Sequence, residues 1–527
     1  MFSFIRRKLK YLRNRPKGPK DEFTYSFLSN NLRDNIHNIQ SIFGNSADIV
    51  IRNFTFGKDS SYEGALVFVD GLVDNIFISR SILSPLSDWK DTLESKDNLI
   101  EFIEKQILQN PEVKRLSTYD DAISDCLNGN TILFVNDCDT CLSISTKGFE
   151  KRAVTEPQSE AVVRGPREGY TENIRTNTSL IRLKIKSPSL RIENYVIGEK
   201  SKTNVALIYL EDVVNPDVLK KLRSRLKRIK VDAIFESGVL EEYIEDSSFS
   251  PFATIAYSEK PDVTAANILE GRIAIVVDGT PFVITVPMLF IESFQSAEDY
   301  YGRNLYTYLI RIVRYVAYLI AVFGPAFYIS LVNYHQGLIP TTLLVTIINA
   351  REGTSFPIII EIIIMLFAFE IMREAGIRLP RPMGQAISIV GALIMGEAAV
   401  NAGLVGAPVV IVVAITAVAS FLIPNQSETI PVLRIFVLIL ATFAGLFGLV
   451  IGLLAILIHL ASLTSFGVPY FSGFTRYNQD SIIRTQLKSM TKRPEGIAKN
   501  NIVRRGSNMK NYSIKENEAE DRVGVQI

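Results

Sequence analysis

The stretch "GQAISIVGALIMGEAAVNAGLVGAP", residues 384–408, decides how the second half of this chain is built. It is apolar enough for a lipid bilayer, yet it is rich in Gly and Ala and carries one carboxylate, Glu397, near its middle. An ionisable group at membrane depth is costly and usually serves a function. The stretch therefore predicts a membrane helix with one specialised face.

The 527 residues change in hydropathy along the chain, from an ordinary soluble composition to a strongly apolar region and then to a polar end. The formal net charge of +2 gives no reason to expect nucleic-acid binding. We predict a basic N-terminal segment, a first cytosolic α/β subdomain, a linker, a second cytosolic α/β subdomain, a membrane domain and a polar, partly disordered tail. Their predicted bounds are 1–39, 40–155, 156–189, 190–300, 301–465 and 466–527.

The soluble half contains two pairs of similar segments. "GALVFVDGLVD" (64–74) resembles "VALIYLEDVVN" (205–215), and "NGNTILFVND" (128–137) resembles "EGRIAIVVDG" (270–279). Each is a short apolar run that ends in a turn, as expected of a buried strand. Because the two members of each pair are separated by nearly equal lengths of chain, we predict two related α/β subdomains.

The sequence gives no sign of an enzyme. Phosphate-binding glycine loops, the serine-hydrolase elbow and the H-E-x-x-H zinc motif are not found in it. Cys138 and Cys141 form one C-x-x-C with no second pair to complete a metal site, so we expect plain thiols. We therefore predict no catalytic activity, no cofactor and no metal.

Apolar runs in the second half predict a polytopic all-α membrane domain of four to six helices, since one crossing needs about 20 apolar residues. Pro325 and Pro357 are expected to break the first two runs, and residues 338–350 are too short to cross alone. Residues 432–460 are long, and are either strongly tilted or split near Gly445 and Gly448. The candidate spans are 312–332, part of 338–372, 386–402, 404–423 and 432–460.

Basic residues near the ends of the spans indicate the orientation. The segment 373–384 and the tail are both rich in Arg and Lys, so both prefer the cytoplasmic side. With the soluble half also inside, this favours an even number of crossings. Arg311 and Arg314 at the start of the first span are expected to extend to the membrane surface as anchors.

A helical projection divides residues 390–403 into two faces. Small residues on one face allow another helix to approach closely, and they are Ala392, Gly396, Ala399 and Gly403. The other face holds the pore and gate candidates Val390, Ile394, Glu397 and Asn401. In an oligomer, rings of acids would favour cations and rings of apolar residues would close a pore by dewetting. The alternative is that Glu397 bonds to a neighbouring helix in a purely structural bundle.

A second acid, Glu361, lies one turn inside the apolar run 357–372 and is a further candidate for a functional or pairing role. A secondary transporter is a competing interpretation, but transporters show repeats within the membrane region, and here the repeat lies in the soluble part. A third interpretation is a non-conducting scaffold that is only anchored by its membrane part.

Three motifs point to a known family. They are "RGPREGYTENIRTN" (164–177), "ESFQSAEDYYGR" (292–303) and "FEIMREAGIRLPRPMGQAISIVGALIMGEAAV" (369–400). With these motifs the chain resembles the GerA family of bacterial spore germination proteins, specifically the A subunit of nutrient germinant receptors, over about residues 40–480. The end of the tail, "GIAKNNIVRRGSNMKNYSIKENEAEDRVGVQI" (496–527), is the part that matches no motif of the family.

The resemblance implies a multi-pass protein of the spore inner membrane with a cytosolic N-terminal domain. It implies two partners, a B subunit that resembles an amino-acid permease and senses the nutrient, and a C subunit that is a lipoprotein. It also implies a homo-oligomeric channel in the lipid bilayer that releases monovalent cations, consistent with a pore at residues 384–408. The sequence leaves open a relative, the stage V sporulation protein AF, which is regarded as an accessory channel that amplifies germination.

Overall fold

The structure, a computed structural model, describes residues 27–90, 99–108, 110–148, 157, 160, 162–378 and 396–471. Two five-stranded sheets form the soluble half. The first has the order β1-β2-β4-β5-β3 and its neighbouring strands are all antiparallel. Its strands are β1 (Ile49–Phe56), β2 (Tyr62–Val69), β3 (Val113–Leu116), β4 (Asn130–Val135) and β5 (Cys141–Ser145).

The second sheet has the order β6-β7-β9-β10-β8. When the strands are counted from the start of each sheet, this is the same order as in the first, as two related subdomains require. The paired sequence segments provide β2 and β4 in one sheet and β7 and β9 in the other. The strands of the second sheet are β6 (Leu190–Ile197), β7 (Thr203–Leu210), β8 (Ala256–Ser258), β9 (Ile273–Val277) and β10 (Val283–Val286).

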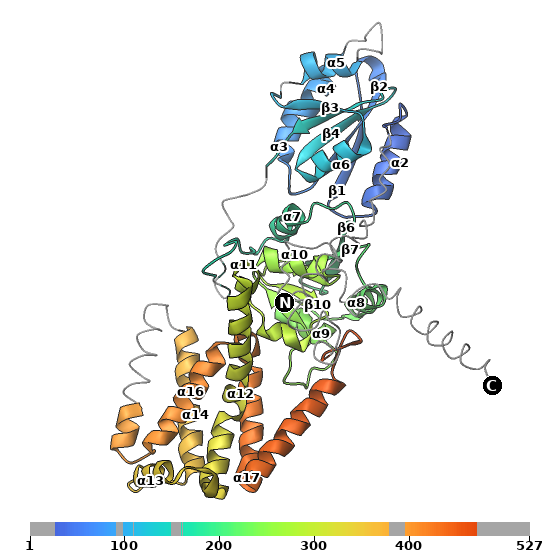
Figure 1. The fold of residues 1–527 in the computed structure, drawn as a ribbon. Helices are drawn as coiled ribbons and strands as arrows, with labels where there is room; N and C mark the ends of the chain where they lie inside the picture. Colours follow the sequence, from blue (N-terminus) through green and yellow to red (C-terminus); the bar gives the residue numbers. More distant parts are fainter. Residues whose placement is uncertain are drawn as a thin grey trace, which may run out of the picture. The chain divides into compact units, whose positions relative to one another are not determined.

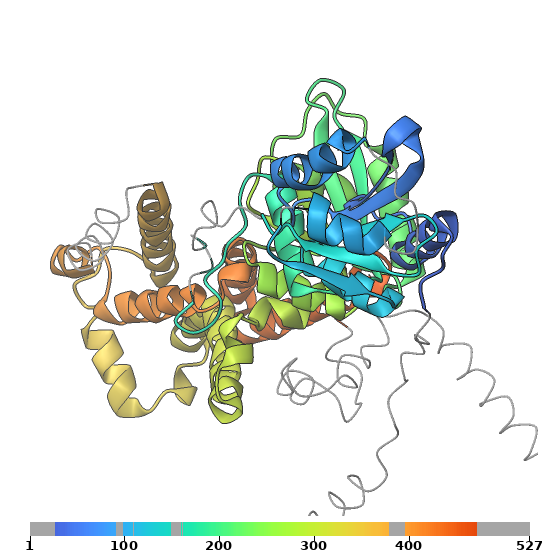
Figure 2. The same ribbon diagram turned by 90° about the horizontal axis from the view of Figure 1, so that it is seen from above.

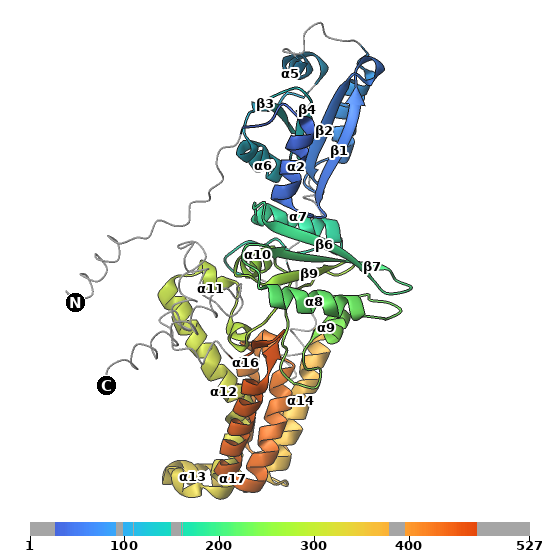
Figure 3. The ribbon, with the colours of Figure 1, turned by 90° about the vertical axis from the view of Figure 1, so that its right-hand side faces the viewer.

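Helices cover both faces of the first sheet (Figure 1, Figure 3). Side chains of a strand alternate between faces, so Leu66 and Phe68 contribute to one hydrophobic cluster and Ala65 and Val67 to the other. The first cluster packs under α3 (Asn75–Ile78), α4 (Ser84–Asp88) and α5 (Leu99–Phe102), and the second under α2 (Leu32–Phe43) and α6 (Tyr119–Leu127).

The chain divides into two compact units. The first contains the first sheet together with α7 (Ile174–Lys184) and parts of β6 and β7. We predicted a linker over residues 156–189, but this segment includes α7, which belongs to the first unit. Arg182 of α7 is fully buried and donates from Nε and Nη2 to the two Asp48 oxygens, at 2.8 and 2.9 Å. A paired charge at such a depth fixes α7 against the start of β1.

The second unit joins the remaining strands to the apolar helices. Phe252, Phe290 and Phe294 share one hydrophobic cluster with residues from these helices. The predicted boundary at residue 300 is therefore wrong, because one core extends across it. The soluble helices of this unit are α8 (Pro216–Arg228), α9 (Ser237–Ile244), α10 (Pro261–Leu269) and α11 (Glu298–Tyr301).

The predicted tail begins too early. Residues 464–469 form a small hairpin of β11 (Thr464–Ser465) and β12 (Val468–Pro469). Tyr470 is fully buried, and its carbonyl accepts a hydrogen bond from Phe290 N at 3.0 Å. The chain up to Phe471 therefore belongs to the packed unit, and the residues after it lie outside the described ones.

The C-terminal region is helical, and its helices lie together in each view (Figure 1, Figure 2). Two of the described helices contain a stretch long and apolar enough to cross a membrane, namely Leu305–Tyr334 and Thr429–Ser462. The residues predicted to be too short to cross form a short helix, α13. The helices are α12 (Asn304–Tyr334), α13 (Thr341–Asn349), α14 (Ile358–Arg378), α16 (Ala407–Phe421) and α17 (Thr429–Ser462).

Helix α17 reverses direction at Gly445, which has φ 58° and ψ −136°. A Cβ built on Gly452 would lie 3.4 Å from Val437 Cγ2, whereas a straight helix would separate the two residues by about 22 Å. The two outer ends reach one loop, because Thr429 Oγ1 donates to Pro251 O (2.6 Å) and His459 Nε2 lies 3.0 Å from the hydroxyl of the adjacent Ser250. Of the two predicted alternatives, the split is the observed one.

The arms of α17, residues 429–444 and 446–462, are each about 24–25 Å long. We call the end of the helices that adjoins residues 250–254 and 288–296 the sheet end, and the opposite end the distal end (Figure 3). The bend at Gly445 lies at the distal end, where its Cβ position is 3.0 Å from Tyr334, the last residue of α12.

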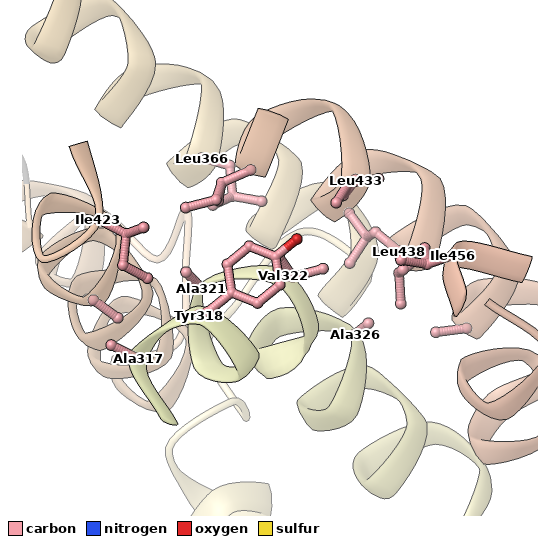
Figure 4. Packing of buried hydrophobic residues seen from close by; sticks show 14 of the residues in the cluster. Ala317, Tyr318, Ala321, Val322, Ala326, Leu366, Ile423, Leu433, Leu438 and Ile456 are labelled. Atoms are coloured by element: carbon pink, nitrogen blue, oxygen red, sulfur yellow. The ribbon is translucent and has the colours of Figure 1, made fainter. Parts of the chain in front are cut away.

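Small residues form the contact face of α12. Ala317, Ala321 and Ala326 are buried against leucine and isoleucine side chains of the neighbouring helices (Figure 4). Gly324 allows the same approach, since a Cβ there would meet Thr416 Oγ1 of α16 at 3.2 Å. Small contact residues compensate for the weak hydrophobic drive between helices in lipid.

The hairpin yields a stability prediction. Gly445→Ala places a side chain at a positive φ and against Tyr334, so we expect a loss of about 1–3 kcal/mol in the free energy of unfolding. Thermal unfolding of the full-length protein in detergent measures it. The control is Gly337→Ala, because Gly337 also lies near the distal end but has no atom within 4 Å of its Cβ position. Equal unfolding temperatures for both variants would contradict the reversal at Gly445.

Candidate functional site

The described part of the predicted pore helix, residues 396–401, has two different faces. Gly396 is buried, and a Cβ there would meet Val410 of α16 at 3.4 Å. Glu397 and Asn401 are both exposed, and Ala399 is half-buried. The division between a packing face and a polar face over the whole predicted helix stays a prediction. Val390, Ala392 and Ile394 lie outside the described residues.

Gly403 does not continue the small-residue face, contrary to the prediction. The helix has ended before it, and Gly403 adopts φ 67° in a turn. Its carbonyl accepts from Ser355 N at 3.0 Å, and a Cβ would lie 2.6 Å from Gly353 O. The glycine therefore serves a close approach of two loops at the distal end.

Glu361 is fully buried near the start of α14 and has specific partners. Its Oε2 accepts from the backbone N of Gly406 at 2.9 Å, and its Oε1 lies 3.3 Å from Arg351 Nη2. Gly406 is the N-cap of α16, where a carboxylate satisfies free N–H groups and the helix dipole. The sequence analysis allowed either a functional or a pairing role for Glu361. These contacts favour the pairing role.

A polar contact missed by the sequence reasoning lies in the middle of the bundle. Helix α12 continues through Pro325, so the prediction that this proline breaks the span is wrong. Proline has no N–H, which leaves the carbonyl four residues earlier, on Ala321, without its helical donor. Arg434 of α17 supplies the donor, with its Nε 2.8 Å from that oxygen.

Arg434 is almost fully buried, and its charge is partly compensated by Glu370 of α14. Its Nη1 lies 3.7 Å from a Glu370 oxygen, and Glu370 also pairs with Arg373 at 2.7 Å. One guanidinium thus contacts α12 and α14 from α17. The available signal in the sequence was an arginine within an apolar run, at the third residue of the predicted span 432–460.

The predicted membrane anchors, Arg311 and Arg314, are also placed differently. Both pair with one Asp299 oxygen, from Arg311 Nε at 2.9 Å and from Arg314 Nη1 at 2.7 Å. Arg311 is buried rather than extended to a surface. The three residues connect α12 to the segment before it, so their role is to fix the start of the first long helix.

Two of the three cysteines of the first unit, Cys126 and Cys141, are buried. Burial raises the pKa of the Cys126 and Cys141 thiols to about 12, so neither forms the thiolate that a nucleophile or metal ligand needs. The described residues also contain no cluster of His, Cys, Asp and Glu that could hold a metal ion. The helical region, with its exposed Glu397, is therefore the candidate site.

Comparison with known proteins identifies the family. The family model described as Bacillus/Clostridium GerA spore germination protein matches residues 37–496. This chain is a member of the GerA family. Within it, spore germination protein KA of Bacillus subtilis is 40% identical over 92% of this chain and 90% of its own length. Spore germination protein GerLA of Bacillus cereus is 38% identical over 89% of this chain and 96% of its own length.

A solved structure also matches this GerA family chain. It is the N-terminal domain of the A subunit of the Bacillus megaterium spore germinant receptor GerK3. The two are 38% identical, the match covers 51% of this chain and 98% of that one, and the TM-score is 0.41. The matches to KA and GerLA extend over most of the chain, so the GerA family assignment covers the helical region as well as the sheets.

The contact between Arg434 and Ala321 predicts a non-additive pair of substitutions. Arg434→Met leaves the Ala321 carbonyl without a donor, at a cost of about 1–3 kcal/mol. Pro325→Ala restores an N–H for that carbonyl, so in this background Arg434→Met should cost at least about 1 kcal/mol less. Thermal unfolding of the four full-length proteins measures the coupling. Strictly additive losses would show that Arg434 acts through other contacts, because its interaction with Glu370 is removed in both backgrounds.

Proposed function

We propose that this chain is the A-type subunit of a spore nutrient germinant receptor, and that several copies form a nutrient-gated cation channel in the spore inner membrane. The observation that carries the proposal is the exposed Glu397 on a helix whose other face packs on α16. Membership of the GerA family supports the receptor role. The action proposed is conduction, with no chemical step.

The path of the described helices supports a multi-pass arrangement with both ends on one side. Helices α12 and the first arm of α17 run from the sheet end to the distal end, while α14, α16 and the second arm return. Arg373 near the end of α14 contacts Ser427 at the sheet end, and Gly403 lies at the distal end. These two positions support the proposed crossing at 386–402, with which the proposed number of crossings is even.

The exposed carboxylate supports assembly of several copies. A charged side chain that faces lipid costs roughly 2–4 kcal/mol or more, and within the described part of a single chain nothing covers Glu397. A ring of copies would place this face toward a water-filled axis instead. Acids in such a ring attract cations and repel anions.

Gating is proposed at Val390 and Ile394, which precede Glu397 on the same predicted face. At rest these apolar side chains keep the path dry. When the permease-like B subunit binds its nutrient, this helix rotates or splays, water enters, and monovalent cations leave down their gradient past Glu397. The C subunit, a lipoprotein, completes the receptor.

The gate predicts a leak. Spores that carry Val390→Ala should release potassium without nutrient, because a smaller side chain weakens the apolar seal. The measurement is potassium release from dormant spores, with the amount of assembled receptor checked by immunoblotting. Ile411→Ala is the matched control, since Ile411 is an exposed apolar residue of the neighbouring α16. A normally assembled Val390→Ala receptor without a leak would exclude this gate and favour the scaffold alternative.

The proposed role of the Glu397 charge predicts an effect on the rate of potassium release. Glu397→Gln should lower the nutrient-triggered potassium release rate severalfold while the complex still assembles, because the amide keeps the size of the side chain and removes the charge. Glu374→Gln is the control, because Glu374 lies at the sheet end of α14, far along the bundle from Glu397. Wild-type release from the Glu397→Gln receptor would move the pore to another helix.

A further inference from the structure

A cavity of about 270 Å³ lies within the second unit, outside the proposed pore. Its walls come from α10, from residues 288–301 and from the loop that joins α16 to α17. Arg314 of α12 also lines it. The cavity thus contacts the soluble sheet region and two of the apolar helices, and neither the strand duplication nor the proposed channel accounts for it.

The charges that line the cavity do not balance. Four carboxylates and two guanidinium groups face it, namely Glu160, Asp262, Glu270, Glu292, Arg272 and Arg314. Arg272 pairs with both Glu292 and Glu270, the latter at 3.3 Å, and Arg314 pairs with Asp299 outside the cavity. Asp299 also pairs with Arg311, so Arg314 counts as a cation of the cavity, and Lys260 adds another at 3.7 Å from Asp262. The four carboxylates still outnumber these three cations, which favours a cation as ligand.

Asp262 has one carboxylate oxygen that lacks a hydrogen-bond donor within the described part of the chain. Its Oδ2 accepts from the Tyr301 hydroxyl at 2.6 Å, but its buried Oδ1 has no hydrogen-bond donor among the described residues. Lys260 Nζ is 3.7 Å away and instead donates to Pro166 O at 2.6 Å. A buried carboxylate oxygen without a donor is unfavourable, so a donor on a ligand would be stabilised here.

Arg272, in contrast, has an N–H group that lacks a hydrogen-bond acceptor in the same described part. Its side chain is almost fully buried, and its Nε–H has no acceptor among the residues that the structure describes. A molecule that satisfies both groups needs a positively charged donor for Asp262 and a neutral acceptor for Arg272. Apolar side chains such as Met288, Val263 and Leu422 complete the walls and would contact a short carbon chain.

We propose that this cavity binds a small organic cation, a primary ammonium compound that also carries a hydroxyl group. The ammonium would donate to Asp262 Oδ1 and interact with the excess carboxylates, and the hydroxyl would accept from Arg272 Nε. Because the cavity wall includes both α10 and the loop between α16 and α17, the ligand would link the soluble region to the helices. This inference does not depend on the channel, and either can fail while the other holds.

The acids of the cavity add a pH dependence. Burial raises the pKa of Glu292 to about 7, against the opposing effect of Arg272, and Glu270 adds to the rise. Burial also raises the pKa of Glu160. The charged groups that face Glu292 are Arg272 and Glu270, with Tyr300 beside them. A cation interacts best with ionised carboxylates, so its binding should strengthen between pH 6 and pH 8.

The test uses the full-length protein in detergent with 3-aminopropan-1-ol as the probe. A ligand that binds only the folded state stabilises it by RT ln(1 + [L]/Kd), so the unfolding temperature rises with the concentration of the ligand and with its affinity. We expect 3-aminopropan-1-ol to raise it more at pH 8 than at pH 6. Propane-1,3-diol, which has the same size without the charge, and potassium at equal ionic strength should leave it unchanged. Equal effects of the diol or of potassium would overturn the proposal, and so would no effect of the amine.

Substitutions locate the binding. Glu270→Gln should raise the apparent dissociation constant at least fivefold, because it removes a charge while its amide oxygen can still accept from Arg272. Asp262→Asn should do the same while it keeps an acceptor for Tyr301. The matched control is Glu242→Gln on the exposed face of α9. Unchanged binding in a folded Glu270→Gln or Asp262→Asn protein would contradict the assignment to this cavity.

Discussion

A backbone carbonyl inside an apolar bundle must find a donor, and here the need is created by Pro325 and met by Arg434. The contact joins α12 to the first arm of α17, with Arg434 Nε 2.8 Å from the freed oxygen of Ala321. The same side chain extends to Glu370, which brings α14 into the arrangement. On the same helix, Ala317, Ala321 and Ala326 are buried among side chains of the neighbouring helices (Figure 4).

Buried ion pairs have the same function at both ends of the bundle. Asp299 holds Arg311 and Arg314 at the sheet end, and Glu361 holds Arg351 and the start of α16 at the distal end. Breaking such pairs is costly once both groups are out of water. The bundle is therefore stabilised by a few polar contacts and many small-residue contacts. The exposed Glu397, which has no ion-pair partner among the described residues, differs from this pattern.

The shared core of the second sheet and the helices bears on regulation. Phe252, Phe290 and Phe294 pack with Tyr318 of α12, so a rearrangement of the soluble part changes the environment of the first long helix. A ligand between α10 and the α16–α17 loop would act at the same place. The second unit of this GerA family member thus has one packed core, which extends across residue 300 into the helices.

The sequence predicted much of the fold because its signals are local. Repeated strand patterns indicated the duplication, and the overlong apolar run left a tilted helix or a split near Gly445 and Gly448 as alternatives. It could not predict which carbonyl Arg434 would reach, since that contact joins residues 321 and 434 through the packing of two helices. The continuous helix at Pro325 was missed for the same reason. On residues 396–401 the periodic pattern assigned Gly396 and Glu397 to different faces, and Gly396 is buried while Glu397 is exposed. The pattern extended too far, because the helix ends before Gly403, whose turn contacts the loop at Gly353.

The central claim is that Glu397 faces water in the assembled receptor. Its most direct test is the labelling of Glu397→Cys, in a Cys138→Ser background, with a membrane-impermeant cationic thiosulfonate reagent during nutrient-triggered opening. A thiol in water ionises and reacts, whereas a thiol in lipid stays protonated. Ile411→Cys on the neighbouring α16 is the lipid-facing reference. The account predicts rapid labelling at position 397 and none at 411. Absence of labelling at 397 in an assembled, responsive receptor would contradict it.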